Sequence, residues 1–248
     1  MGKFSAEFII RYSSLGSNLT LSFPKLMDYL QDASTQHTNH AGFRPDWFTI
    51  NNQAWVITQW DVVFHKLPEW NDRLTVETWP SSFKSFVAER SFSARLNGEL
   101  VCTALSDWIF TDLTVPKPLR PTKEIVEGYG DVLPSAHIRS SESVKTLETL
   151  DYTLLSRREM TVGRRDIDTN NHVNNLAYII WAYDDIPDEL FSTCEIKRLQ
   201  AAYKKECRLK DRVIIETSVC KDKSDLIMTK IINPDGFVAA EVFTRWGK

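Results

Sequence analysis

The stretch FHKLPEWNDRLTVET, residues 64–78, has a counterpart in YKKECRLKDRVIIET, residues 203–217, at a constant offset of 139 positions. Both stretches end in Asp-Arg, a mainly aliphatic triplet and Glu-Thr. Two unrelated strand-turn-strand units with similar residues would also explain this likeness. The order of the elements around the two stretches agrees as well, and this agreement favours an internal duplication.

The elements around the first stretch are one helix and an antiparallel meander. Alternating residues predict a strand over 8–12, and apolar residues at helical spacing predict a helix over 24–40. Pro24 suits the first turn of that helix, and Gly42 suits its end. Asn97-Gly98 is typical of a hairpin turn. The strands predicted after the helix cover residues 54–66, 72–79, 86–96 and 99–111.

The elements around the second stretch repeat that order. A strand is predicted over 160–162 and a helix over 175–183, and further strands over 197–207, 212–220, 226–232 and 237–246. Residues 115–150 are rich in Pro, Ser and Glu without a sustained period, which indicates a linker. We therefore expect an α+β fold of the double hot-dog type, in which each copy wraps a long helix in an antiparallel sheet. The N-terminal repeat would cover residues 1–114 and the C-terminal repeat residues 151–248.

The composition is that of an ordinary globular protein. Of 248 residues, 42% are hydrophobic and 25% are charged, which argues against a disordered chain. No apolar run approaches the ~20 residues that span a bilayer, and no apolar signal segment follows the N-terminus, so we expect a cytoplasmic protein without stable membrane insertion. The net charge of −3 argues against nucleic acid as a partner. The four cysteines lack CxxC or zinc-ligand spacing, so neither disulfides nor a metal site is expected.

The densest polar cluster comes just before the second predicted helix. If this segment is extended, Asp168, Asn170 and His172 project from one face and bring a carboxylate, an amide and an imidazole together. Asn174 or Asn175 would cap the helix, whose first turn offers unpaired N–H groups to a carbonyl oxygen on which negative charge develops. An Asn-rich loop whose side chains only satisfy the backbone is the alternative interpretation.

The spacing Asp166-x-Asp168-x-Asn170 also matches the first ligands of a calcium-binding EF-hand loop. Further along, Asn171 occupies the position of the required glycine, and Ala177 that of the bidentate glutamate. A calcium site is therefore not expected.

Two motifs resemble those of the acyl-acyl-carrier-protein (acyl-ACP) thioesterases of plants and bacteria. The first runs from Asp168 through His172 to Trp181, and the second is Tyr203-Lys204-Lys205-Glu206-Cys207, with His172 and Glu206 34 positions apart. The resemblance covers nearly the whole chain and is weaker in its first half. It implies hydrolysis of fatty acyl-ACP to a free fatty acid and holo-ACP. Because a thioester is already activated, no metal or organic cofactor is expected. The plant members carry a transit peptide, which this chain is expected to lack, so the chain is more similar to a bacterial member.

The resemblance implies a catalytic set of Asp168, Asn170, His172 and Glu206. From the helix-cap position, Asn174 and Asn175 are expected to bind the substrate. A cysteine nucleophile, Cys207, is the rival of Glu206. Neighbouring residues of a regular strand point to opposite faces, so the two side chains would not both face His172. The resemblance favours Glu206 and leaves Cys207 as a packing thiol. Whether Glu206 or Asp168 activates water or attacks the thioester stays open.

The N-terminal repeat has no counterpart of this polar set, so we expect it to shape the acyl pocket. ACP is acidic as a class, and candidates for its docking are the basic residues Arg164, Arg165, Lys204 and Lys205. A hot-dog acyl-CoA thioesterase, a hot-dog dehydratase and a non-catalytic acyl-binding protein are the rival functions. Acyl chain length is left open, and so is a homodimer.

Overall fold

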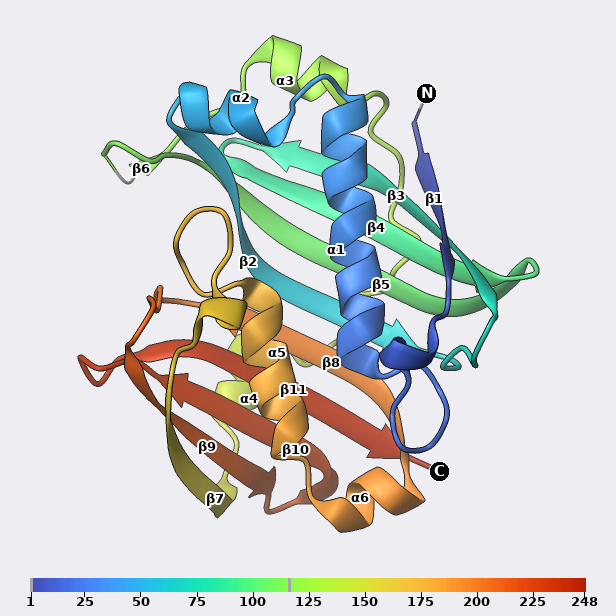
Figure 1. Cartoon of the computed structure of the whole chain (residues 1–248), viewed down its shortest axis with the longest axis vertical. Coiled ribbons are helices and arrows are strands. Elements are labelled where there is room, and N and C mark those ends of the chain that lie inside the picture. The colour runs from blue at the N-terminus through green and yellow to red at the C-terminus, as the bar shows by residue number, and fades with distance from the viewer. Residues whose placement is uncertain (1, 116) are drawn as a thin grey trace. The chain divides into compact units, whose positions relative to one another are not determined.

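The computed structural model describes residues 2–115 and 117–248, which form two compact units. Unit 1 comprises Met1–Thr58 and Val62–Ile138, and unit 2 comprises Gln59–Asp61 and Arg139–Lys248. No helix within the described residues has both the length and the apolar character needed to cross a membrane. Each unit is built from one antiparallel sheet and one main helix (Figure 1).

The sheet of unit 1 has the strand order β1-β3-β4-β5-β2, and β6 pairs with β5. Helix α1 packs against β1 and β3 through a face that includes the fully buried Leu26, Met27 and Leu30. This face explains why the 18 residues from Phe23 to His40 form a helix. The elements of unit 1 are β1 (Phe4–Ile9), α1 (Phe23–His40), α2 (Pro45–Ile50), β2 (Gln53–Phe64), β3 (Arg73–Lys84), β4 (Val87–Leu96), β5 (Glu99–Asp112), β6 (Lys117–Pro118) and α3 (Lys123–Gly128).

The sheet of unit 2 has the order β8-β11-β10-β9-β7, and α5 packs on β9 and β11. Its elements are α4 (Val144–Glu148), β7 (Tyr152–Thr161), α5 (Asn175–Asp184), α6 (Asp188–Thr193), β8 (Glu195–Tyr203), β9 (Arg212–Cys220), β10 (Lys223–Ile232) and β11 (Val238–Gly247). Both units therefore follow one plan, and the predicted α+β double hot-dog fold is confirmed.

Unit 2 buries side chains on both faces of its sheet. On one face Ile231 packs with Tyr178 and Trp181 of α5. On the other face Met228, three positions earlier in the same strand, packs with Leu147 of α4. Since successive strand residues point to opposite faces, the α5 face and the α4 face are the two sides of one sheet.

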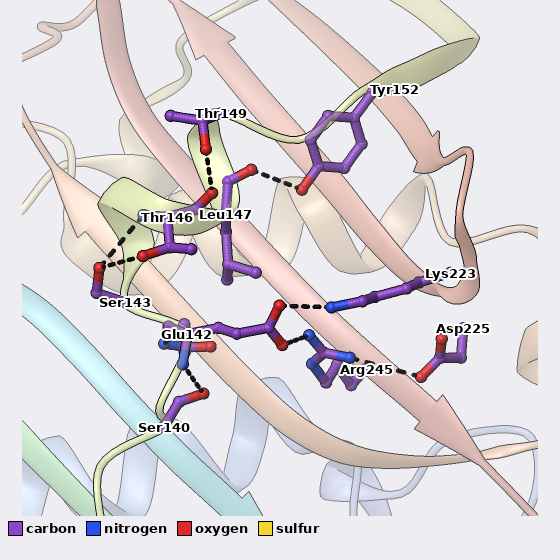
Figure 2. A network of polar contacts seen from close by, with 11 residues as sticks. Ser140, Glu142, Ser143, Thr146, Leu147, Thr149, Tyr152, Lys223, Asp225 and Arg245 are labelled. Atoms are coloured by element: carbon purple, nitrogen blue, oxygen red, sulfur yellow. Dashed lines mark hydrogen bonds and ion pairs between the residues drawn. The ribbon is translucent and has the colours of Figure 1, made fainter.

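Ion pairs hold the segment that carries α4 on the α4 face of the unit 2 sheet (Figure 2). The Glu142 carboxylate lies between the Lys223 ammonium and the Arg245 guanidinium, and Arg245 also reaches Asp225. Ser143 caps α4 by accepting a hydrogen bond from the Thr146 N–H at 3.2 Å. The stretch 115–150, predicted to be a linker, thus contains β6, α3 and α4 and is tied to the sheet at Glu142.

Several element boundaries differ from the sequence predictions. Strand β1 begins at Phe4 rather than residue 8, and a 3₁₀ turn occupies Tyr12–Ser14. Strand β7 covers Tyr152–Thr161 rather than residues 160–162. Strand β8 ends at Tyr203 rather than at residue 207, because the N–H groups of both Lys204 and Lys205 donate to the carbonyl of Ala239 and so end the regular ladder.

Candidate active site

The segment between Ile167 and Val173 is a tight loop, so it does not adopt the extended conformation that would place Asp168, Asn170 and His172 on one face. Ile167 and Val173 form an isolated antiparallel bridge, and the Asp168 N–H donates to the His172 carbonyl at 2.8 Å. Asn171 has a φ of 61°, in the left-handed region that asparagine tolerates better than most residues. The polar side chains are therefore arranged by a turn and not by strand alternation.

Asp168 holds this turn together from within. Its Oδ1 accepts hydrogen bonds from the Asn170 N–H at 2.8 Å and from the His172 N–H at 3.2 Å. Its Oδ2 lies 3.5 Å from Asn170 Nδ2, at the long limit of a hydrogen bond. The contacts of this carboxylate are thus made with the loop backbone and Asn170, as the alternative of an Asn-rich, self-satisfying loop anticipates.

The structure brings His172 and Glu206 together. His172 Nε2 lies 3.1 Å from Glu206 Oε2, and the two side chains are 28% and 60% exposed. The segment that carries Glu206 is fixed to the His172 loop by a hydrogen bond from the Val173 N–H to the Cys207 carbonyl at 2.9 Å. An imidazole and a carboxylate in contact, open to solvent, can exchange a proton and hold a water molecule.

Cys207 has different surroundings from its neighbour Glu206. Its side chain is fully buried in the core cluster on the α5 face, together with Val173, Tyr178 and Trp181. Burial raises the pKa of the Cys207 thiol, which disfavours the thiolate form needed for nucleophilic attack. The side chains do diverge, although the strand on which the sequence argument relied has already ended.

The start of α5 lies directly after this loop. Asn174 is the N-cap, as predicted, and its side chain accepts a hydrogen bond from the Leu176 N–H at 2.9 Å. The Asn175 carbonyl accepts a hydrogen bond from Tyr203 Oη at 3.1 Å. The Asn175 N–H has no acceptor within residues 2–115 and 117–248, so the positive end of the helix keeps one free donor.

Two supports of this site were not predicted. Asp166 is buried, its side chain accepts from the Gly163 N–H at 2.7 Å, and its carbonyl accepts from the Asn174 N–H at 2.8 Å. Lys204, a docking candidate in the sequence, instead lies 2.6 Å from Glu241 and 2.9 Å from Glu148. In the sequence, only the helix-capping pattern could have indicated the role of Asp166. No local pattern predicts that Lys204 pairs with Glu148 and Glu241, because both are distant from it in the chain.

Across the described residues, no group of three or more His, Cys, Asp or Glu side chains is placed to hold a metal ion. The candidate site consists of His172, Glu206, the Asp168 turn and the start of α5.

Comparison with known proteins agrees with this architecture. The chain is 27% identical over 256 residues to an oleoyl-acyl carrier protein thioesterase of Coriandrum sativum, an alignment that covers 98% of the chain and 69% of that relative. The crystal structure of an acyl-ACP thioesterase from Bacteroides thetaiotaomicron superposes with a TM-score of 0.85 at 21% identity, covering 99% of this chain and 98% of that one. The 12:0-ACP thioesterase from Umbellularia californica gives 0.82 at 22% identity, covering 99% and 97%.

The chain spans about half to two thirds of the length of the curated plant relatives it matches. The family model of the acyl-ACP thioesterase N-terminal domain matches residues 2–129, and that of the C-terminal domain matches residues 151–248. Since the two matches leave few residues uncovered, the chain belongs to the acyl-ACP thioesterase family, as the sequence motifs predicted.

Proposed function

We propose that this chain hydrolyses the thioester of a fatty acyl-ACP to a free fatty acid and holo-ACP, at the site formed by His172, Glu206 and the start of α5. The observation that carries the proposal is the 3.1 Å contact between His172 Nε2 and Glu206 Oε2. His172 lies just before the start of α5, where the Asn175 N–H is free to bind the substrate. Family membership supplies the substrate class.

In the proposed mechanism Glu206 acts as the general base. Its carboxylate takes a proton from water, and the water oxygen attacks the thioester carbonyl carbon. The carbonyl oxygen becomes negative and is stabilised by the Asn175 N–H and the positive end of α5. As the C–S bond breaks, His172 donates a proton to the leaving thiolate and takes up the water proton from Glu206 across their 3.1 Å contact, which returns both groups to their starting state. The thioester is already activated, so the step needs no cofactor.

The other site residues have supporting roles in this proposal. Asp168 shapes the turn through the N–H groups of Asn170 and His172, so Glu206 is the better base of the two carboxylates. Asn170 is exposed on the turn and orients the substrate or water, and Asn174 and Asn175 bind the thioester end of the substrate. Direct attack by Glu206 to give an anhydride uses the same geometry and is the variant of this mechanism to be tested.

The N-terminal repeat, residues 1–114, is proposed to shape the acyl pocket. Leu67 stands at the position equivalent to Glu206, so the repeat lacks the base. ACP is the proposed protein partner, with Arg164, Arg165 and Lys205 as exposed docking candidates. Action in the cytoplasm and a homodimer stay predictions.

The test is a panel of acyl-ACPs of varied chain length, with matched acyl-CoAs, assayed for free fatty acid and free thiol. We expect release of both products from acyl-ACP, and faster release than from the matched acyl-CoA. Equal or faster turnover of acyl-CoA would favour an acyl-CoA thioesterase. Binding without release of either product would favour a non-catalytic acyl-binding protein.

A further inference from the structure

A buried arginine in unit 1 lies outside the site described above. Arg90, in the middle of β4, is 8% exposed. Its Nη1 donates to His37 Nδ1 at 2.9 Å and to Thr78 Oγ1 at 3.3 Å. The Nε and Nη2 groups have no hydrogen-bond acceptor within residues 2–115 and 117–248. Three of the five N–H donors of this guanidinium are therefore unused by the protein.

The positive charge of Arg90 is also not balanced. None of the carboxylates in the described residues forms an ion pair with it. Burial, the Arg90 charge and His40 lower the pKa of His37 to about 3, so His37 is neutral and its Nδ1 accepts from Arg90 without balancing the charge. Tyr129 lies with its ring 5.1 Å from the guanidinium carbon, and burial raises the pKa of its phenol, which keeps it neutral too. The guanidinium is thus largely buried without an anionic partner, and its unused N–H groups are available to one.

A cavity of about 30 Å³ adjoins Arg90. A single water needs roughly 10–15 Å³ on this measure, so the space suits a group of two or three heavy atoms. Its walls are largely aromatic, with Trp55, Phe83, Trp108 and Tyr129 among the lining residues. Glu89, which precedes Arg90 in the strand, also lines it.

We propose that this cavity is a binding site for the carboxylate group of an organic acid, held by the free N–H donors of Arg90. A planar guanidinium matches the two oxygens of a carboxylate in a fork. The aromatic walls would contact the carbon of the carboxylate group, which a purely inorganic anion lacks. The cavity admits the carboxylate and not a long alkyl chain, so a longer acid must extend beyond it. The site lies wholly in unit 1 and does not depend on the proposed function.

The experiment is a calorimetric titration of the full-length chain with butyrate at constant ionic strength. Methyl butyrate is the uncharged control ligand, and octanoate separates a fatty acid from a small acid as the source of the carboxylate. We expect saturable binding of butyrate and none of the ester. Octanoate binding more tightly through the same arginine would identify a fatty acid as the preferred source.

The decisive variant is Arg90→Met, which should weaken butyrate binding about tenfold or more, because a charge-assisted bidentate contact is lost. Arg95→Met, on the same strand, removes an arginine that donates to the Gly98 carbonyl and does not line the cavity, so it should leave binding unchanged. If Arg90→Met does not fold, Ala88→Val, which fills the cavity and keeps Arg90, should weaken binding instead. Undiminished butyrate binding in the folded variant, or equal binding of chloride and phosphate by the wild type, would overturn the proposal.

Discussion

Glu206 and Cys207 are neighbours in the chain with opposite surroundings, and this contrast decides which of them can do chemistry. Glu206 is 60% exposed beside His172, whereas Cys207 is fully buried with a raised thiol pKa. Glu206→Gln keeps the shape but removes the base, so we expect the rate of fatty acid release to fall about a hundredfold or more. Cys207→Ala should retain substantial activity, and its thermal stability is measured as the control for correct folding.

The opposite result has a clear signature. A well-folded but inactive Cys207→Ala enzyme, with a stable acyl adduct on Cys207 in the wild type, would favour a cysteine nucleophile.

Asp168 offers a second contrast at the scale of one residue. Its Oδ1 accepts two backbone N–H groups of the turn, and the Oδ1 of an asparagine can accept the same bonds. We therefore expect Asp168→Asn to retain more activity than Asp168→Ala, measured as kcat with a small acyl thioester. Equal and complete loss in both variants would instead make the negative charge of Asp168 part of the chemistry.

At the scale of elements, the end of β8 is held from both faces of the sheet. On the α5 face the Cys207 carbonyl accepts the Val173 N–H. On the α4 face Lys204 joins Glu241 of β11, whose side chain is 3% exposed, and Glu148 of α4. Burial opposes the charge on Lys204, but hydrogen bonds with Glu241 and Glu148 outweigh it and raise the pKa of Lys204. Glu206 follows two residues later.

From this arrangement we predict that Lys204 positions Glu206. Lys204→Met should lower kcat by about tenfold to a hundredfold with little change in KM, because small displacements of a reacting group are costly. Lys204→Arg should restore much of the rate. With a small acyl thioester as substrate, which needs no docking of the carrier, Lys205→Met is the matched control, since Lys205 lacks these ion pairs and lies over the Phe237 ring.

Lys204→Met also removes the closer cation from the buried Glu241 and leaves Lys230 at 3.8 Å, so it should destabilise the protein. Adding Glu241→Gln should recover stability but not kcat. Recovery of both would reduce Lys204 to a structural role.

The elements also show what the sequence could predict. The helix α5 begins within its predicted bounds because an Asn cap and a mostly buried helix leave a strong local signal. Strand β7 was largely missed because its middle is exposed on both faces, including Leu154 and Leu155, so no alternation marks it. The arrangement of the Asp168 turn depends on one left-handed residue, Asn171, which a pattern of side-chain types does not encode.

The residues of the candidate site could be predicted from the sequence, but their geometry could not. His172 and Glu206 were paired by motif alone, 34 positions apart. The Lys204 cluster and the bonding of Asp168 required the fold, because their partners are set by strand register and by turn conformation.

At the scale of the whole molecule, the net charge of −3 must still allow an acidic carrier to approach. The charge of Lys204 is neutralised by its ion pairs. We therefore expect the acidic carrier to bind exposed cations such as Arg164, Arg165 and Lys205. We predict that raising salt lowers kcat/KM for acyl-ACP more than for a neutral small thioester, because ions screen charges beyond about 8 Å at physiological ionic strength. Equal salt sensitivity of the two substrates would contradict charge-guided docking.

The four cysteines are distributed so that they can act as reporters of breathing motions. Cys102 lies in unit 1, Cys207 and Cys220 lie in unit 2, and all three are at most 2% exposed, whereas Cys194 is partly accessible. In the native state an alkylating reagent should modify Cys194 first. The rate of each later modification, located by mass spectrometry, then reports how often the unit that contains that cysteine opens. The native chain therefore needs no engineered label to show whether its two repeats open together or one at a time.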